Sequence, residues 1–279
     1  MAVITTVNQL TETPPPQRLR YGLFTAATVM NDLGPREIAT GFQFAAMDCG
    51  VARLYDSECP PGENEPKTFD EGLPYMEADP FWVYSTRQCG TVGTTPSLFM
   101  ESVRRRLAGG EQTQVEAQLW TQLNADAGTV TVAAGALGAG SAIAALEESF
   151  YSDYGYVGTI HVNTLAYAPA SYAQLVEHGT GGVLQTPLGS VWSFGAGYGI
   201  TGPAGVAPTA GHVWAFMTPY VMIRRSELIA QDDPRSFLDR PANQYMGLAE
   251  RVYAATWTCP VVHAVQIPIA APYVINTPT

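Results

Sequence analysis

The fold of this chain is decided by one stretch, TPSLFMESVRRRLAGGEQTQVEAQLWTQL, which runs from Thr95 to Leu123. Thr95 can cap a helix, and a proline at position 96 suits the first helical turn. Apolar side chains then recur at every fourth position, the spacing of one helical face, at Phe99, Val103, Leu107, Val115, Leu119 and Leu123. The pattern predicts a long helix that is kinked or broken at the pair Gly109-Gly110.

Outward from this helix, strands and further helices are expected in a mixed order. Apolar runs and alternation predict strands over 41–47, 51–55, 81–84, 157–162, 183–200, 213–217, 221–225 and 261–269. Helical spacing predicts helices over 141–155, 169–178 and 241–256. Because helices and strands do not alternate as regular βαβ units, the fold class is α+β.

The first 40 residues are predicted to form an extended arm. Pro14, Pro15 and Pro16 favour polyproline geometry, and only the short apolar patch Leu23-Phe24 follows. Such a segment has little of its own to bury. It is therefore expected to lie on a neighbouring molecule or on the main body.

A long acidic segment separates the strands predicted before residue 56 and after residue 80. It is rich in proline and glycine and carries Glu58, Glu63, Glu65, Asp70, Glu71, Glu77 and Asp79. A stretch of this length without structure is unusual inside a compact domain and is commonly functional. We predict a protruding, hairpin-like loop over 56–79 that makes contacts with other molecules.

Composition points to a surface that is covered by other protein. The 279 residues suffice for one large or two modest globular units, yet only 14% of them are charged, against about a quarter in most globular chains. Thirteen arginines stand beside a single lysine, Lys67, and protein interfaces are enriched in arginine and depleted in lysine. The net charge of −11 argues against wrapping nucleic acid with the whole surface.

No motif for a metal, a membrane or secretion is visible. The four cysteines, Cys49, Cys59, Cys89 and Cys259, lack CxxC spacing, and the four histidines are scattered, so neither a metal nor a cofactor is expected. The longest weakly apolar run, 132–146, is too short to cross a bilayer, and no secretory signal precedes it. Reduced thiols in a cytoplasm are the default expectation.

Enzymatic motifs are weak. Gly195, Gly197 and Gly199 could suggest a phosphate-binding loop, but Gly202-Pro203 follows where a helix should begin. His161 and His263 lie in strand patterns and are expected to be structural rather than catalytic. A small-molecule enzyme that uses the loop 195–199 stays as an alternative, which stabilisation by a nucleotide would support.

The order of these elements resembles the Hong Kong 97-like major capsid proteins of tailed phages. Residues 99–107 and 115–120 look like the family's spine helix, 144–148 with 154–162 like its helix-to-strand entry into the A-domain, and 243–253 with 261–267 like its final helix and strand. The resemblance implies an arm (1–40), a strand with an extended loop (41–95), a spine helix (96–135), an A-domain (136–235) and a return helix and strand of the peripheral domain (236–279).

This resemblance implies a structural role without enzymatic activity. Members build icosahedral shells from pentamers and hexamers, so a phage head that encloses double-stranded DNA is expected, assembled in the host cytoplasm and located in the virion. Scaffolding, portal and decoration proteins are the expected partners, with weak non-specific DNA contact and no membrane. Encapsulin nanocompartments share this fold and are the main alternative.

The resemblance also suggests contact residues. In the extended loop these are Lys67, Glu63, Glu65, Asp70 and Glu71, and on the spine helix they are Arg104, Arg105 and Arg106, each expected to meet a neighbour's carboxylate or to be solvated. The loop Gly195, Gly197, Gly199 is expected near the centre of a ring. Some relatives join a loop lysine to an asparagine with help from a glutamate, and Lys67, Asn243 and Glu250 are loose counterparts, with a plain exposed lysine as the alternative.

Overall fold

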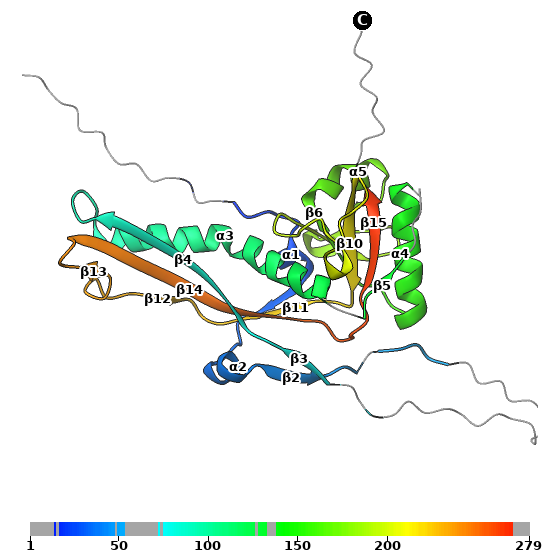
Figure 1. Cartoon of the computed structure of the whole chain (residues 1–279), viewed down its shortest axis with the longest axis horizontal. Helices are drawn as coiled ribbons and strands as arrows, with labels where there is room; N and C mark the ends of the chain where they lie inside the picture. The colour runs from blue at the N-terminus through cyan, green and yellow to red at the C-terminus, as the bar shows by residue number, and fades with distance from the viewer. Residues whose placement is uncertain are drawn as a thin grey trace, which may run out of the picture.

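The structure is a computed structural model that describes residues 14, 17–47, 49–53, 72, 75–125, 128–132 and 138–269. These residues form an elongated molecule with a long helix and a narrow sheet at one end and a wider sheet at the other (Figure 1). A small lobe lies beneath the middle. Mixed helices and strands confirm the α+β class.

The long helix is α3 (Pro96–Ala125), and it is continuous. The predicted break at Gly109-Gly110 is wrong, because the helix passes through both glycines. Two glycines inside a helix cost about 1 kcal/mol each relative to alanine, and burial of the apolar face on either side offsets this cost. Every member of the predicted stripe is buried, from Phe99 to Leu123.

A six-stranded sheet lies along α3. Its longest strand, β14 (Gln244–Thr256), pairs antiparallel with β4 (Phe81–Gly90) over ten residues. The opposite edge of β14 is occupied by β11 (Met222–Arg225), β12 (Ile229–Ala230) and β13 (Leu238–Asp239). The sheet ends with β1 (Thr28–Met30), which runs parallel to β11.

The helix predicted over 241–256 is wrong, because this segment is the strand β14. Tyr245, Leu248, Val252 and Ala255 suit one helical face, but strand pairing on both edges of β14 decides the conformation. Residues 252–256 are all buried, so this part of the strand has no solvent-facing side. Tertiary contacts of this kind override local helix propensity.

The wider end holds a seven-stranded sheet in the order β5-β15-β10-β6-β9-β8-β7. Its strands are β5 (Val130–Thr131), β15 (His263–Pro268), β10 (His212–Thr218), β6 (Thr159–Asn163), β9 (Val191–Gly195), β8 (Leu184–Gln185) and β7 (Glu177–His178). They confirm the strands predicted near 157–162, 213–217 and 261–269. Short 3-10 turns lie at Thr164–Ala166, Thr180–Gly182 and Pro203–Gly205.

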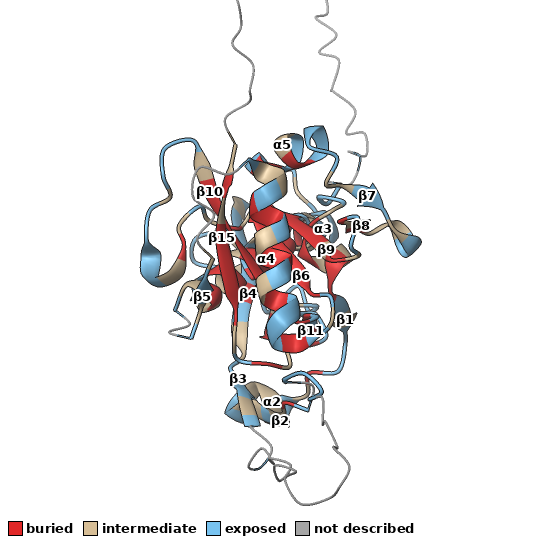
Figure 2. Cartoon of the chain, turned by 90° about the vertical axis from the view of Figure 1, so that its right-hand side faces the viewer, coloured by how far each residue is buried: buried red, intermediate tan, exposed pale blue. Residues whose placement is uncertain are grey.

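Helix α4 (Ala139–Tyr154) covers one face of this sheet, and the strands behind it are almost wholly buried (Figure 2). It ends at Gly155, whose φ of 73° is a left-handed conformation that favours glycine. The predicted helix 141–155 is thereby confirmed. The helix predicted over 169–178 is only partly right, because α5 (Tyr167–Tyr172) ends earlier and Glu177–His178 form β7.

The described part of the N-terminal segment is not an extended arm. It forms α1 (Leu23–Ala26), then β1, then α2 (Pro35–Thr40). Leu23 is completely buried and belongs to the same core as the apolar face of α3. The segment therefore lies on its own main body, one of the two places expected for it.

The small lobe contains α2 and a two-stranded antiparallel sheet of β2 (Phe42–Ala45) and β3 (Tyr75–Ala78). A pair of strands around the acidic segment was predicted, but the second strand lies at 75–78, and 81–84 belongs to β4. Residues 51–53 are not a strand. Lys67, Glu63, Glu65, Asp70 and Glu71 lie outside the described residues.

Two buried clusters make up the core. One lies between α3 and the six-stranded sheet, and the other lies between α4, α5 and the seven-stranded sheet. The expectation of reduced thiols is wrong for one pair, because Cys49 and Cys259 form a disulfide. Among the described helices, none combines the length and apolar character needed to cross a bilayer.

Candidate assembly surfaces and the contacts that position them

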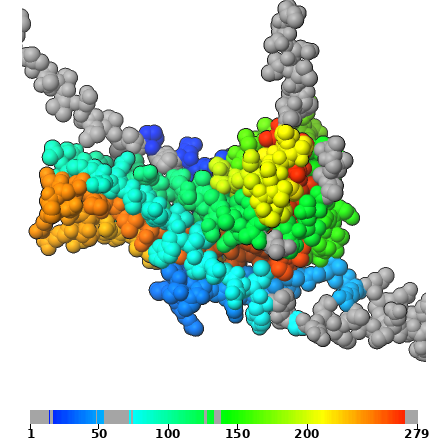
Figure 3. Space-filling model, viewed as in Figure 1, coloured from blue at the N-terminus to red at the C-terminus, as the bar shows by residue number. Residues whose placement is uncertain are grey.

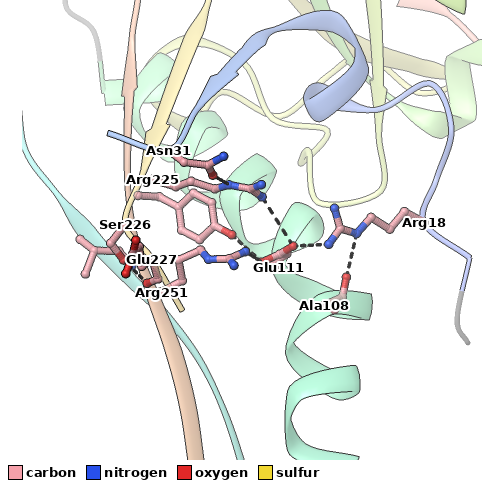
Figure 4. Close-up of polar contacts among 10 residues, drawn as sticks. Arg18, Asn31, Ala108, Glu111, Arg225, Ser226, Glu227 and Arg251 are labelled. Atoms are coloured by element: carbon pink, nitrogen blue, oxygen red, sulfur yellow. Dashed lines mark hydrogen bonds and ion pairs between the residues drawn. The ribbon is translucent and has the colours of Figure 1, made fainter. Parts of the chain in front are cut away.

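A buried carboxylate, Glu111, joins α3 to three other segments (Figure 4). It occupies a position of the apolar stripe, four residues after Leu107, and its side chain is 1% exposed. Its oxygens accept hydrogen bonds from the Tyr253 hydroxyl (2.6 Å) and from Arg251 Nη1 (2.9 Å), and Arg18 forms a further ion pair with it. Glu111 thereby holds the N-terminal segment and β14 to the middle of the helix.

Cations surround this carboxylate because burial of a lone charge is expensive. Arg225 Nη1 on β11 lies 4.0 Å from Glu111 as well. Burial and the neighbouring carboxylate raise the pKa of the Tyr253 hydroxyl, so it stays protonated and remains a donor. A charged residue in a predicted apolar stripe was the available sequence signal for this cluster, and the sequence reasoning missed it.

A second buried carboxylate, Glu116, lies little more than one turn further along α3. It accepts hydrogen bonds from the backbone N–H of Leu23, the backbone N–H of Gly197 and the Gln112 side chain, each at 3.0 Å. Burial raises the pKa of Glu116, and these hydrogen bonds partly oppose the shift. Glu116 therefore ties the N-terminal segment and the glycine loop to the same helix.

The predicted loop of Gly195, Gly197 and Gly199 packs against α3. A Cβ atom at Gly197 would lie 1.9 Å from the Thr113 carbonyl oxygen, and one at Gly199 would lie 2.7 Å from Trp120 Nε1. Close approach of the loop to the helix explains the glycines. Their position near a ring centre stays a prediction, and these contacts do not require it.

His161 is completely buried on β6. Its ring shares hydrogen bonds with the Tyr198 hydroxyl (3.0 Å, Nδ1) and with Thr218 Oγ1 (2.9 Å, Nε2). The Tyr198 hydroxyl lies 2.7 Å from Ser193 Oγ. Burial lowers the pKa of His161 to about 3, so the ring is neutral near pH 7. These contacts tie β6, β9 and β10 together and agree with a structural histidine.

His263 lies beside Ser149 and Asp153, which are one turn apart on α4. Ser149 Oγ is 2.9 Å from Nδ1 of His263, and Asp153 Oδ2 is 3.2 Å from Nε2. Burial lowers the pKa of His263, while Asp153 opposes the shift. The contacts link α4 to β15, and none of the three residues lines any of the four cavities that are described.

The three spine arginines all have partners within the chain. Arg104 forms an ion pair with Asp232, Arg105 Nε lies 2.7 Å from Glu101, and Arg106 Nη1 donates to the Thr86 carbonyl (3.3 Å). Arg104 and Arg105 are exposed by more than a third, and pairs of this kind are weak and exchangeable. Contact with a neighbour's carboxylates stays a prediction.

One face of the six-stranded sheet exposes large apolar side chains. Trp82 and Tyr84 on β4 are 51% and 65% exposed, and Met246 on β14 is 50% exposed. Ile229 on β12 is paired with Glu250, which is paired with Tyr84 across β14, so these side chains share a face. Exposed apolar patches of this kind mark interaction surfaces.

The wider end carries a second group of exposed apolar side chains. Leu165 and Tyr172, beside and on α5, are 56% and 66% exposed. At the opposite end, Val92 in the turn after β4 is 89% exposed. Apolar contact surface is therefore present at both ends of the molecule.

The loose cross-linking counterparts lie at separate places. Asn243 precedes β14 in a left-handed conformation (φ 51°), and its side-chain oxygen accepts a hydrogen bond from Thr91 (2.8 Å). Glu250 lies within β14, not on the expected helix. Within the described part of the chain, no group of three or more His, Cys, Asp or Glu side chains could hold a metal ion.

Comparison with solved structures shows that this chain is similar to capsid proteins over nearly its whole length. The capsid of the empty GTA particle is similar with a TM-score of 0.56 at 12% identity, covering 94% of this chain and 95% of the other. The capsid of Ralstonia phage GP4 gives 0.56 at 9% identity, covering 98% and 99%. The chain has the Hong Kong 97-like capsid fold.

A third structure, from Mycobacterium phage Adephagia, is similar with a TM-score of 0.52 at 10% identity over 91% of this chain and 90% of the other. No protein-family model matches this sequence, and no curated protein is similar to it in sequence. The capsid fold is thus recognised by its three-dimensional arrangement. At identities near 10%, the similarity carries the fold and not the residues of any site.

Proposed function

We propose that this chain is the shell-forming subunit of a phage head. The observation that carries the proposal is similarity to phage capsid structures over more than nine tenths of both chains. In this proposal the subunits form pentamers and hexamers of an icosahedral shell that encloses double-stranded DNA. Scaffolding, portal and decoration proteins are its proposed partners, and the virion is its proposed location.

The exposed surfaces support an assembling subunit. Trp82 and Tyr84 leave 51% and 65% of their surface exposed on one face of the six-stranded sheet. Aromatic anchors of this type are enriched at protein interfaces. In the assembled shell, we propose that this face and the end around Tyr172 are covered by neighbouring copies. The proposed role is structural, without a catalytic step.

The test is expression of the chain alone and with a scaffolding protein, followed by negative-stain imaging. We expect closed particles of uniform size. A well-behaved monomer under both conditions, stabilised by a nucleotide, would contradict the proposal and favour an enzyme. Particles that copurify with a cargo enzyme in place of DNA would favour an encapsulin-like compartment.

A sharper test removes residues 56–71 of the acidic segment and keeps β3, which pairs with β2. We expect a folded body that no longer forms regular shells. Neutralisation of Glu63, Glu65, Asp70 and Glu71 tests the predicted ion pairs with the spine arginines. The matched control is Glu148→Gln, an exposed position on α4, which is expected to assemble normally.

A further inference from the structure

The disulfide Cys49–Cys259 connects two parts of the molecule that share no sheet. Its Cα atoms are 5.5 Å apart, although the two cysteines are 210 positions apart in the sequence. Cys49 follows β2 in the small lobe, and Cys259 lies between β14 and β15 in the main body. Within the described residues, β2 and β3 pair only with each other. The lobe lies beneath the body as a separate bulge (Figure 3).

The non-covalent attachment of the lobe is limited. Arg224 of the body stacks over the Phe42 ring at 4.6 Å and forms a two-pronged ion pair with Asp32. Next to this contact lies a cavity of about 680 Å³, with Phe42 and Phe44 on the lobe side and Trp257 on the body side. The lobe is continuous with β1 and β4 of the body and contacts β14 through β3, so the disulfide adds a third covalent connection at the side of this cavity.

The two sulfurs differ in access. Cys49 is exposed, whereas Cys259 is completely buried in the core beneath α4, with the Tyr156 hydroxyl 3.6 Å from its sulfur. Thiol–disulfide exchange requires access of the attacking thiolate to the partner. A small reagent therefore meets Cys49 first, and the buried Cys259 can react only with the sulfur of Cys49 itself.

We propose that Cys49 and Cys259 form a thiol–disulfide exchange site whose reaction partners are small disulfides such as oxidised glutathione. The Cys49 thiolate attacks the small disulfide, forms a mixed disulfide and releases one small thiolate. The Cys259 thiolate then attacks the Cys49 sulfur and releases the second. Two cysteine thiols are oxidised, one small disulfide is reduced to two thiols, and the two cysteine protons pass through solvent to the leaving thiolates.

This reactivity gives the lobe two states. In a reducing cytoplasm the pair is open, and the lobe is attached by its chain connections to β1 and β4 and by non-covalent contacts, such as those of Arg224 with Phe42 and of β3 with β14. In an oxidising medium the pair closes and secures β2 and β3 to the body. If the chain is a phage shell subunit, as proposed above, assembly occurs with the pair open and closure follows release from the cell.

The chemical test uses the reduced, full-length chain. It is exposed to oxidised glutathione, alkylated and mapped by peptide mass spectrometry. We expect a Cys49–Cys259 linked peptide and a rise in Tm of about 10 °C, since a bridge over a long loop stabilises strongly. A Cys49–Cys59 link, or glutathione that remains on Cys49 while Cys259 stays reduced, would overturn the proposal.

Two variants separate the bridge from general effects of cysteine loss. Cys49→Ser should abolish the linked peptide and make Tm insensitive to the oxidant. Cys89→Ser is the matched control, because Cys89 is a partly exposed free cysteine, and it should keep both the link and the shift. A redox-dependent Tm in Cys49→Ser would contradict the assignment.

Hydrogen exchange locates the effect in the structure. On reduction, the amides of 42–45 and 75–78 should exchange at least about tenfold faster, while those of β10 should not change. Unchanged exchange in the lobe would refute its attachment by the bridge. All these readouts use the isolated chain, so a chain that links as expected but forms no particles would refute only the proposed function. If the natural chain forms particles but gives no Cys49–Cys259 link with oxidised glutathione, only this inference is refuted.

Discussion

The sheets at the two ends of the molecule differ in how far their apolar side chains are buried. In the seven-stranded sheet, β6 and β10 are buried on both faces, and α4 packs over β15, which pairs with β10. In the six-stranded sheet, β4 alternates: Val83 and Ser85 are buried beneath α3, while Trp82 and Tyr84 face outward. One end contains a complete core, and the other leaves an apolar face uncovered, which suits a subunit that is completed by copies of itself.

The largest expected loss of stability comes from the core of the wider end. Phe150 is completely buried, with the rings of Tyr154, Tyr156 and His263 around it. Phe150→Ala should lower the free energy of unfolding by about 3–5 kcal/mol through lost burial and a cavity. Urea denaturation measures this. Leu165→Ala, at an exposed position nearby in the same end, is the control and should change stability by less than about 0.5 kcal/mol.

The contact between α3 and the six-stranded sheet at Glu111 has the next largest expected effect. Glu111→Ala leaves Arg251, Arg225 and the Tyr253 hydroxyl without their shared acceptor and should cost about 3 kcal/mol. The same denaturation series measures it, with the exposed Glu148→Ala as the matched variant. If both changes cost equally little, the carboxylate does not hold the six-stranded sheet to α3.

A smaller, pH-dependent effect is expected at Glu116. Because burial raises its pKa above the ordinary 4.5, the folded chain holds this proton more tightly than the unfolded chain. The resulting stability is present below pH 4.5 and is lost as the pH rises through the raised pKa. The unfolding free energy of Glu116→Gln should therefore rise relative to that of the natural chain between pH 4.5 and 7. Loss of one hydrogen-bond acceptor lowers the stability of the variant by an amount that does not depend on pH. A pH-independent difference in unfolding free energy would contradict this.

The smallest expected change in stability concerns the uncovered face. Replacement of both Trp82 and Tyr84 by alanine should alter the unfolding free energy of the isolated chain by less than about 1 kcal/mol, because both side chains are largely solvated. Particle yield, measured by sedimentation, should instead fall at least tenfold. If this variant forms normal particles, the exposed face of the six-stranded sheet is not needed for contact between copies.

Local patterns predicted much of this architecture. The spacing of Phe99, Val103 and Leu107 was sufficient to place α3, and the left-handed cap at Gly155 ended α4 where the glycine predicted. Alternating and continuous apolar runs placed β6, β10 and β15 within two residues. These elements are specified by neighbours in the sequence, so a sequence pattern can find them.

The errors have a common physical origin. Residues 244–256 form a strand because β4 and β11 lie beside them, and both partners are distant in the sequence. Glu111 was not recognised because its cations come from residues 18, 225 and 251. The bridge joins Cys49 and Cys259, which are 210 positions apart in the sequence. A local pattern can mark a residue such as Glu111 as unusual, but it does not identify distant partners.

The sequence by itself determined that this protein has a long amphipathic helix, an α+β element order and few surface charges, because periodicity and composition are local properties. Only the tertiary structure decided that 244–256 is a strand, that the glycine loop packs against α3, and that two buried carboxylates hold the N-terminal segment in place. Strand pairing and charge burial are contacts between distant residues, and their free energy exists only once the chain has brought those residues together.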